Sequence, residues 1–352
     1  MKIALLNDTH FGVRNDSPAF MEYQNDFYNN LFFPYLKEHN IKTLIHLGDV
    51  VDRRKFINHK TAHNFRKVFW DKLWEEKIDT HIILGNHDTY YKNTNEVNAI
   101  ENLYTSFDGK NEPFIYTHTQ EVEIDGCNIL FIPWICDDNY DDSLYAIDNT
   151  AATVAMGHLE VKGFEMHKGH INDHGLEKKL FDKFDIVYSG HFHKKSDDGR
   201  IYYLGTQYEM TWSDYQCPKG FHIFDTDTRE LTRVSNPKTI HEKIYYDDGK
   251  EDYNLHDISK YNKKFVKMYI MNKSDDKVYD KFLGRLYNDI SMHELQIIED
   301  TTDITTSVSD DLIEKGEDTM TFLRNYIDEI DTDLDKNKLK EFTKECYSEA
   351  IE

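Results

Sequence analysis

Short apolar runs alternate with longer stretches of helical periodicity in the first part of the chain. The runs at residues 2–6, 41–47 and 80–84 each end abruptly at polar residues, as buried strands do where they lead into a loop. Hydrophobic positions between them recur at helical spacing, around residues 20–35 and 62–73. Strand and helix in alternation predict βαβ units and a mainly parallel sheet.

The pattern changes beyond residue 120, where shorter apolar runs follow one another closely. Asp125-Gly126 separates two of them and is a strong signal for a two-residue hairpin. Two later runs each lead to a Gly-His pair. The predicted hairpins join 122–124 to 128–132 and 220–224 to 230–234, and the further strands cover 151–156 and 185–188.

A new pattern begins after Pro237. Residues 265–271 and 294–298 read as strands and 276–287 as a helix, which together outline a small βαβ-type unit. The segment 299–335 then holds thirteen acidic and two basic residues, and its first part has the composition of a linker.

The last residues carry two amphipathic patterns. Apolar side chains recur at i, i+4, i+7 and i+11 and then again after a polar break, at Leu323, Ile327, Ile330, Leu334, Leu339, Phe342 and Cys346. Two short helices are the natural prediction, and core packing or homodimerisation would explain them as simply as binding to a partner. We expect a domain at 1–237, a small α+β cap at 238–300, an acidic linker at 301–317 and a helical segment at 318–352.

Composition narrows the class of protein. The chain has 352 residues, which suggests two structural units, and it has only 6 Pro and 16 Gly, too few for a low-complexity protein. We expect no membrane span and no secretion signal, because no apolar stretch approaches the length of either. Four scattered cysteines without a CxxC pair fit a reducing compartment, so a cytoplasmic location is expected.

The chain is strongly acidic. Its formal net charge is −23, which favours solubility and, taken alone, argues against a polyanionic partner. The charge is not uniform, because residues 241–352 carry 28 acidic and 16 basic residues and much of that excess lies in 299–335. A few basic residues lie close in sequence to the polar strand ends and could follow a phosphate backbone, namely Arg53, Arg54, Lys55, Lys60, Lys194 and Lys195.

Candidate chemistry gathers just past the carboxyl ends of the predicted strands. Five separate strand ends carry carboxylates, an amide or imidazoles, and such ends converge at one edge of an α/β sheet. Each motif alone is weak, since a turn Asp or a surface His explains it, but five accidents in this order are improbable. The candidates are Asp8, His10, Asp49, Asn86, His87, His158, His191 and His193.

The residue types indicate a metal centre. Imidazole with carboxylate and amide oxygens, and without thiolate, suits Mn, Fe or Zn. Seven candidate ligands are too many for one ion, but they suit two ions about 3.5 to 4 Å apart that share a carboxylate, as in two-metal phosphoryl transfer. The predicted reaction is phosphoester hydrolysis.

Five motifs resemble those of the calcineurin-like metallophosphoesterases, over about residues 1–235. They are Asp8-x-His10, Gly48-Asp49, Gly85-Asn86-His87-Asp88, Gly157-His158 and Gly190-His191-x-His193. The resemblance implies an α/β fold, a four-layer sandwich of two mixed sheets flanked by helices. It also implies that the small domain at 238–300 is a DNA-facing cap and that the helical segment at 318–352 docks on an ATPase partner.

The same resemblance implies a role for each candidate residue. One ion would be held by Asp8, His10, Asp49 and His193, and the other by Asp49 as the bridging ligand with Asn86, His158 and His191. His87 would bind no metal, stabilising the phosphorane and protonating the leaving alkoxide instead. The ions are expected to be Mn²⁺, with Mg²⁺, Fe²⁺ or Zn²⁺ as alternatives.

Further segments narrow the branch of the family. Residues 131–134, 203–208 and 219–224 resemble the SbcD and Mre-type recombination nucleases, and 58–61, 211–215 and 224–230 resemble the T4-type bacteriophage branch. This implies a Mn-dependent DNA nuclease, exonucleolytic on duplex ends and endonucleolytic on single strands. Its expected partners are DNA and an SbcC/Rad-type SMC-like ATPase, with a homodimer inside a heterotetramer. For a phage-encoded protein, the expected location is the host cytoplasm.

Alternatives remain open at this stage. A phosphomonoesterase or cyclic-nucleotide phosphodiesterase could use the same fold, and an inactive scaffold subunit is a third possibility. Archaeal and eukaryotic relatives carry a second histidine where this chain has Asp52, which leaves the role of that position in doubt. Arg53 could bind phosphate, as in phosphatases, or be a solvated arginine.

Overall fold

The structure is a computed structural model, and it describes residues 1–103, 112–167 and 170–299, together with Ile327, Lys336, 338–340 and 342–343. The chain divides into two compact units, residues 1–210 with 214–301 and residues 211–213 with 302–352. Nearly all described residues belong to the first unit.

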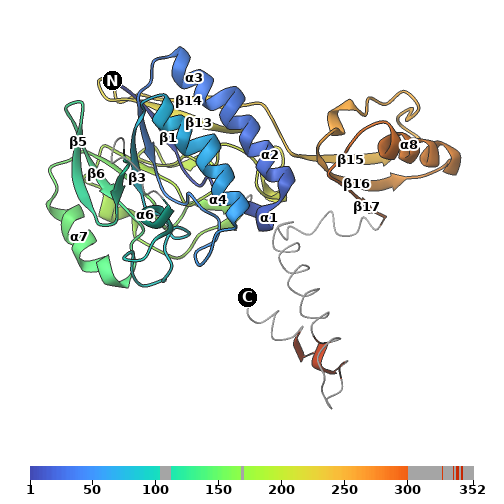
Figure 1. The fold of residues 1–352 in the computed structure, drawn as a ribbon. Coiled ribbons are helices and arrows are strands. Elements are labelled where there is room, and N and C mark those ends of the chain that lie inside the picture. The colour runs from blue at the N-terminus through green and yellow to red at the C-terminus, as the bar shows by residue number, and fades with distance from the viewer. Residues whose placement is uncertain are drawn as a thin grey trace. The chain divides into compact units, whose positions relative to one another are not determined.

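A six-stranded sheet forms one half of the main domain (Figure 1). Its order is β14-β13-β1-β2-β3-β4, with β1 to β4 parallel and β13 and β14 joined as an antiparallel hairpin. The predicted strands and the second hairpin are confirmed. The bounds are β1 (Lys2–Leu6), β2 (Thr43–His46), β3 (Asp79–Ile83), β4 (Phe114–Tyr116), β13 (Lys219–Asp225) and β14 (Leu231–Asn236).

A second six-stranded sheet has the order β11-β12-β10-β7-β6-β5. Its inner strands are parallel, and both edges are antiparallel. The Asp125-Gly126 hairpin is confirmed. The strands are β5 (Gln120–Ile124), β6 (Cys127–Ile132), β7 (Val154–Gly157), β10 (Ile186–Ser189), β11 (Ser196–Asp197) and β12 (Ile201–Tyr203), and a short hairpin pairs β8 (Glu165–His167) with β9 (His170–Ile171).

Helices cover the outer faces, and α2, α3 and α4 lie together along the first sheet (Figure 1). π-helical turns at Tyr28–Phe32 and Arg66–Trp70 continue α2 into α3 and α4 into α5. The helices are α1 (Val13–Asp16), α2 (Pro18–Phe27), α3 (Phe33–Glu38), α4 (His59–Phe65), α5 (Asp71–Glu75), α6 (Ala99–Leu103) and α7 (Tyr140–Asn149), with 3₁₀ turns at Asp137–Asn139, Lys178–Phe181, Trp212–Asp214 and Ser259–Tyr261.

Successive side chains of a strand point to opposite faces of its sheet and pack into different layers of the core. On β1, Ile3 and Leu5 lie in the core between the two sheets, whereas Ala4 and Leu6 lie in the core beneath the helices. A third buried cluster packs the outer face of the second sheet against α7 and the Lys178–Phe181 turn. Helices, sheet, sheet and helices form the predicted four-layer sandwich.

Residues 241–298 form a separate parallel sheet, β15-β16-β17, with its own core against α8. Its elements are β15 (His241–Asp247), β16 (Phe265–Asn272), α8 (Asp276–Asn288) and β17 (Glu294–Ile298). Three of these elements match the predicted ones, whereas β15 was not predicted, because its charged and polar positions break the apolar run. Asp275 caps α8 by accepting hydrogen bonds from the backbone N–H groups of Lys277 and Val278.

The predicted linker at 301–317 lies outside the described residues, as does most of the helical segment at 318–352. The few described positions there, Ile327, Lys336, 338–340 and 342–343, are helical. The domain boundaries stay predictions. Within the described part of the chain, every helix is too short or too polar to cross a lipid bilayer.

Candidate metal centre

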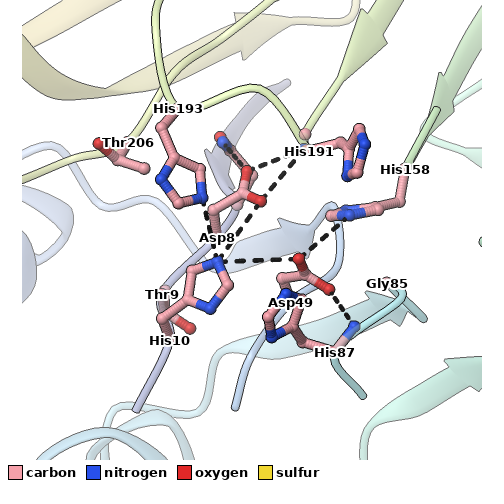
Figure 2. Close-up of polar contacts among 12 residues, drawn as sticks. Asp8, Thr9, His10, Asp49, Gly85, His87, His158, His191, His193 and Thr206 are labelled. Atoms are coloured by element: carbon pink, nitrogen blue, oxygen red, sulfur yellow. Dashed lines mark hydrogen bonds and ion pairs between the residues drawn. The ribbon is translucent and has the colours of Figure 1, made fainter. Parts of the chain in front are cut away.

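Five loops at the carboxyl ends of β1, β2, β3, β7 and β10 bring together all eight candidate residues. Figure 2 labels seven of them, all except Asn86. Three of these strands belong to the first sheet and two to the second, so the candidate site lies where the two sheets present the same edge. Hydrogen bonds and close polar contacts link the eight residues into one connected set. Which of them bind metal stays a prediction.

The first group of ligand atoms comes from Asp8, His10 and His193, and these atoms lie within 4.8 Å of one another. The Nε2 atoms of His10 and His193 are 3.2 Å apart, and Nε2 of His10 is 3.9 Å from Asp8 Oδ1. Figure 2 shows the two imidazoles facing each other beside the carboxylate of Asp8. The group has the composition of a cation site with two nitrogen ligands and one carboxylate.

The second group comes from Asp49, His158 and His191, again with ligand atoms within 4.8 Å. Oδ2 of Asp49 is 3.3 Å from His158 Nε2. The side-chain oxygen of Asn86 adds a further ligand atom, 3.0 Å from His158 Nε2 and 3.1 Å from His191 Nδ1. These four residues are the set expected for the second ion.

The carboxylate of Asp49 lies between the two groups. Its Oδ2 atom is also 3.7 Å from Nε2 of His10 in the first group, while Oδ1 accepts a hydrogen bond of 2.7 Å from the backbone N–H of His87. One oxygen is thus held by the protein, and the other faces imidazoles from both groups. This arrangement fits the predicted bridging role.

The orientation of His158 shows why the site suits a cation. Its Nδ1 donates to the carbonyl of Leu47 at 2.8 Å, so Nε2 carries the lone pair in the neutral ring. That lone pair faces the carboxylate of Asp49 and the amide oxygen of Asn86, which are both acceptors. Acceptors gathered at these distances need a proton or a metal ion between them, so the donor set fits a metal.

The pKa values of two imidazoles, those of His158 and His10, point the same way, whereas burial lowers the pKa values of His191 and His193. Burial alone lowers the pKa of His158, but the carboxylates of Asp49 and Asp8 outweigh it and raise the pKa to about 9. His10 behaves alike, since burial lowers its pKa whereas Asp52, Asp49 and Asp8 raise it to about 9. The buried carboxylates therefore favour positive charge at this edge of the sandwich.

Four candidate ligands have left-handed backbone conformations, which residues other than glycine rarely adopt. The φ angles are 48° at Asp8, 42° at His10, 56° at Asp49 and 84° at His191. Such residues cost about 1 to 3 kcal/mol each and persist only where neighbouring structure fixes them. Hydrogen bonds between the loops do so, from Asp8 N to Gly48 O at 2.9 Å and from His10 N to Asp49 O at 3.1 Å.

Gly85 makes room for the carboxylate of Asp49. A Cβ atom at this position would lie 2.2 Å from Oδ1 of Asp49, well inside van der Waals contact. Glycine is therefore required because the loop after β3 passes directly against Asp49. The glycine of the Gly-Asn-His-Asp motif has this steric origin.

His87 lies beside the two groups. Its ring stands edge-on to that of His10, with centroids 4.8 Å apart, and its Nδ1 donates to the backbone carbonyl of Asp52. The ligand atoms of His10, Asp52 and His87 also lie within 4.8 Å of one another. Because the carbonyl occupies Nδ1, the nitrogen of His87 left for a substrate is Nε2.

Asp52 and Arg53, whose roles the sequence left open, have definite contacts. Oδ1 of Asp52 lies 3.4 Å from Nδ1 of His10, where a carboxylate orients the ring and directs Nε2 toward Asp8. Arg53 forms an ion pair with Asp16, and its guanidinium lies 4.5 Å from the ring centre of Phe56. Arg53 is thus bound to its own protein rather than freely solvated.

Other basic residues of the suggested phosphate track are also engaged. Arg54 donates to the carbonyls of Thr89 and Tyr91, and Lys194 forms an ion pair of 2.5 Å with Glu165. Fewer cations are therefore available for a polyanion than the sequence count suggests.

Asp88 is a buried residue whose role the sequence analysis missed. Its carboxylate accepts hydrogen bonds from the backbone N–H groups of Asp49, Val50, Val51 and Gly85, at 2.8 to 3.2 Å. It thereby ties the loop after β2 to the loop after β3. The available signal was its place in the Gly-Asn-His-Asp motif.

Three buried side chains support the loops from behind. The hydroxyl of Tyr208 and the amide of Gln24 both donate to the carbonyl of Thr9, at 2.7 and 3.0 Å. The ammonium of Lys219 donates to the carbonyl of His193 at 3.1 Å. Tyr208 and Lys219 stand in segments that carried the family resemblance, and Gln24 gave no sequence signal.

Replacing Asp88 by alanine should destabilise the main domain. Asp88→Ala leaves four buried backbone N–H groups without their acceptor, so we expect a loss of about 3 kcal/mol or more and a fall of about 6 to 12 °C in thermal midpoint. Calorimetry in EDTA measures this shift apart from any metal effect. Asp173→Ala is the control, because that carboxylate is 85% exposed. A shift no larger than the control's would contradict the assigned role.

Comparison with known proteins places this geometry in a family. The model of the calcineurin-like phosphoesterases matches residues 1–195. Exonuclease subunit 1 of Enterobacteria phage T4 is 33% identical over 357 aligned positions, covering 100% of both chains. Two solved structures are more distant matches. A novel archaeal phosphodiesterase has 16% identity and a TM-score of 0.33, and the match covers 67% of this chain and 100% of that one. A dimetal phosphatase from Danio rerio has 10% identity and a TM-score of 0.39, and the match covers 67% of this chain and 95% of that one. The chain belongs to the calcineurin-like phosphoesterase family.

Proposed function

We propose that this protein is the nuclease subunit of a recombination and repair complex and hydrolyses DNA phosphodiester bonds by a two-metal mechanism. The observation that carries the proposal is the pair of ligand groups sharing Asp49. Full-length similarity to a protein named as an exonuclease subunit supports DNA as the substrate. The expected activity is exonucleolytic on duplex ends and endonucleolytic on single strands.

The proposed ligands are Asp8, His10, Asp49 and His193 for one ion and Asp49, Asn86, His158 and His191 for the other. Two divalent ions, most simply Mn²⁺, would supply Lewis-acid charge to the phosphoryl group and lower the pKa of attacking water. The chain's own contribution is to hold the ligand atoms in place before substrate arrives, through the buried bonds of Asp88, Asp52 and Leu47.

His87 is the proposed proton donor to the leaving sugar oxygen. Its Nδ1 is fixed by the carbonyl of Asp52, and its ring stands against His10. A ring held this way can present a protonated Nε2 to substrate without serving as a ligand.

Replacing His87 tests whether this residue acts in the cleavage step without binding metal. His87→Ala should lower kcat for DNA cleavage by about 10²-fold or more, the usual range for a positioned acid, and leave metal stoichiometry unchanged. The measurements are cleavage of end-labelled duplex in Mn²⁺ and metal content by mass spectrometry. The matched control is His118→Ala, an exposed histidine outside the candidate ligand set. Wild-type cleavage by His87→Ala would refute the assignment.

The principal rival is a phosphomonoesterase or cyclic-nucleotide phosphodiesterase with the same ligands. It predicts rapid hydrolysis of p-nitrophenyl phosphate or of a cyclic nucleotide and none of DNA. An inactive scaffold is disfavoured, because degenerate scaffolds lose ligands and all eight candidate residues are present here. Comparing the three substrates in Mn²⁺ and in Mg²⁺ discriminates among these functions.

The proposed partner is an SbcC/Rad-type SMC-like ATPase, bound through residues 318–352. Arg53, Arg54 and Lys194 are engaged within the protein, and the net charge is −23. A chain with so few available cations needs a partner to retain DNA. We further propose that two nuclease subunits pair within a heterotetramer.

This proposal makes the subunit alone a weak DNA binder. Fluorescence anisotropy with a labelled duplex should give at least tenfold weaker binding without the ATPase, and binding should weaken further between 50 and 200 mM salt.

Removing residues 318–352 should abolish co-purification with the ATPase and spare hydrolysis of bis(p-nitrophenyl) phosphate. Unchanged co-purification of the truncated chain would exclude this docking segment.

A further inference from the structure

A cavity of about 440 Å³ opens beside the second ligand group, and His158 forms part of its wall. Most of the remaining lining is apolar and includes Trp134, Leu144, Leu159 and Leu180. The volume is within the range of small-molecule sites. The predicted metal ligands alone do not account for an apolar cavity at this position.

Trp134 lines the cavity next to the imidazoles. Its ring centre lies 5.1 Å from that of His191 and 6.1 Å from that of His158. The backbone around it is fixed, since its N–H donates to Leu84 O at 2.8 Å and its carbonyl accepts from the side-chain amides of Asn95 and Asn139. The cavity thus has a rigid aromatic wall next to the place where the phosphate would bind.

The part of the wall formed by Glu160, Gly175 and Leu176 is also preformed. Backbone hydrogen bonds join Leu176 N to Glu160 O at 2.8 Å and Lys162 N to Leu176 O at 3.0 Å. Gly175 has a φ of 89°, and a Cβ there would lie 2.2 Å from Glu160 O, so only glycine lets the two segments approach this closely. This wall does not depend on a ligand to form.

We propose that the cavity receives one unpaired nucleobase of the strand being cut, from a nucleotide flanking the scissile phosphate. The inference rests on the proposed function and specifies its substrate. A phosphodiester bound at the ligand groups places a base within one nucleotide on either side, so covalent connection brings a base to this cavity. Flipped or unstacked bases lie against aromatic and apolar side chains in base-flipping enzymes and in proteins that bind single strands.

The charged lining residues are Glu160, Glu177 and Lys179, so two carboxylates and one ammonium offer both acceptors and a donor to the edge of a base and suit it better than a phosphate. Glu160 lines the cavity, and a carboxylate accepts hydrogen bonds from the exocyclic amino groups of bases but repels phosphate. Glu177 at the rim is paired with Lys162 at 2.7 Å. The cavity would therefore favour frayed ends and single strands, where a base can leave the stack at low cost.

The substrate itself provides the first test. Single-stranded oligonucleotides with a tetrahydrofuran abasic residue on one or the other side of the cleaved bond are compared with the normal strand in Mn²⁺. Base stacking on aromatic side chains predicts about a tenfold loss in kcat/KM at one of the two positions. Equal kcat/KM values for all three strands would overturn the proposal.

Variants of the cavity provide the second test. Leu180→Trp should fill the cavity, and Trp134→Ala should remove its aromatic wall; both should raise KM for the normal strand about tenfold while changing it little for the abasic strand. Trp134→Phe should restore most of the loss. Tyr145→Ala is the control, since that side chain is 70% exposed on α7 outside the lining. Equal effects on both strands would overturn the proposal.

A third measurement distinguishes this inference from the function on which it rests. Bis(p-nitrophenyl) phosphate has no nucleobase, so its hydrolysis reports on the ligand groups alone. A wild-type protein that hydrolyses this ester and cleaves no DNA would overturn the nuclease function, and the inference with it. DNA cleavage that ignores the abasic residue would overturn the inference and leave the nuclease function standing.

Discussion

The buried carboxylate of Asp49, shared between two sets of imidazoles, is the interaction on which the rest of the site depends. One oxygen is fixed by the backbone of His87, and the other faces His158 and His10. Such a carboxylate is costly to bury unless positive charge balances it. The imidazoles of His158 and His10 provide part of that charge when protonated, since the carboxylates raise their pKa values to about 9. The same cluster of carboxylate, amide and imidazole atoms has the composition of a cation site.

The fold makes this sharing possible. Two sheets packed face to face present the carboxyl ends of β1, β2 and β3 beside those of β7 and β10, so loops far apart in sequence supply one site. The ligand loops carry backbone strain at Asp8, His10, Asp49 and His191, and the layers beneath them are fully buried. Core packing thus stabilises conformations that the loops would not adopt alone.

Much of this could be predicted from the sequence, because strand-to-loop motifs are local. Asp8, Asp49 and His158 follow apolar runs directly, so both the strands and the candidate ligands were identified. What was missed depends on contacts between distant segments. The carboxylate of Asp88 accepts a hydrogen bond from the backbone of Asp49 in another loop, and Arg53 forms an ion pair with Asp16, 37 positions earlier in the chain. The strand at 241–247 was missed because charged residues interrupt its apolar positions. The cavity beside Trp134 could not be predicted, because three segments that are distant in sequence form its lining.

Anomalous diffraction from crystals grown with Mn²⁺ tests the central claim most directly, because it locates each ion without reference to activity. We predict two peaks about 3.5 to 4 Å apart, with one ion bound by Asp8, His10 and His193, the other by Asn86, His158 and His191, and the Asp49 carboxylate contacting both. A single peak at saturating Mn²⁺, or two peaks of which only one contacts Asp49, would contradict the account.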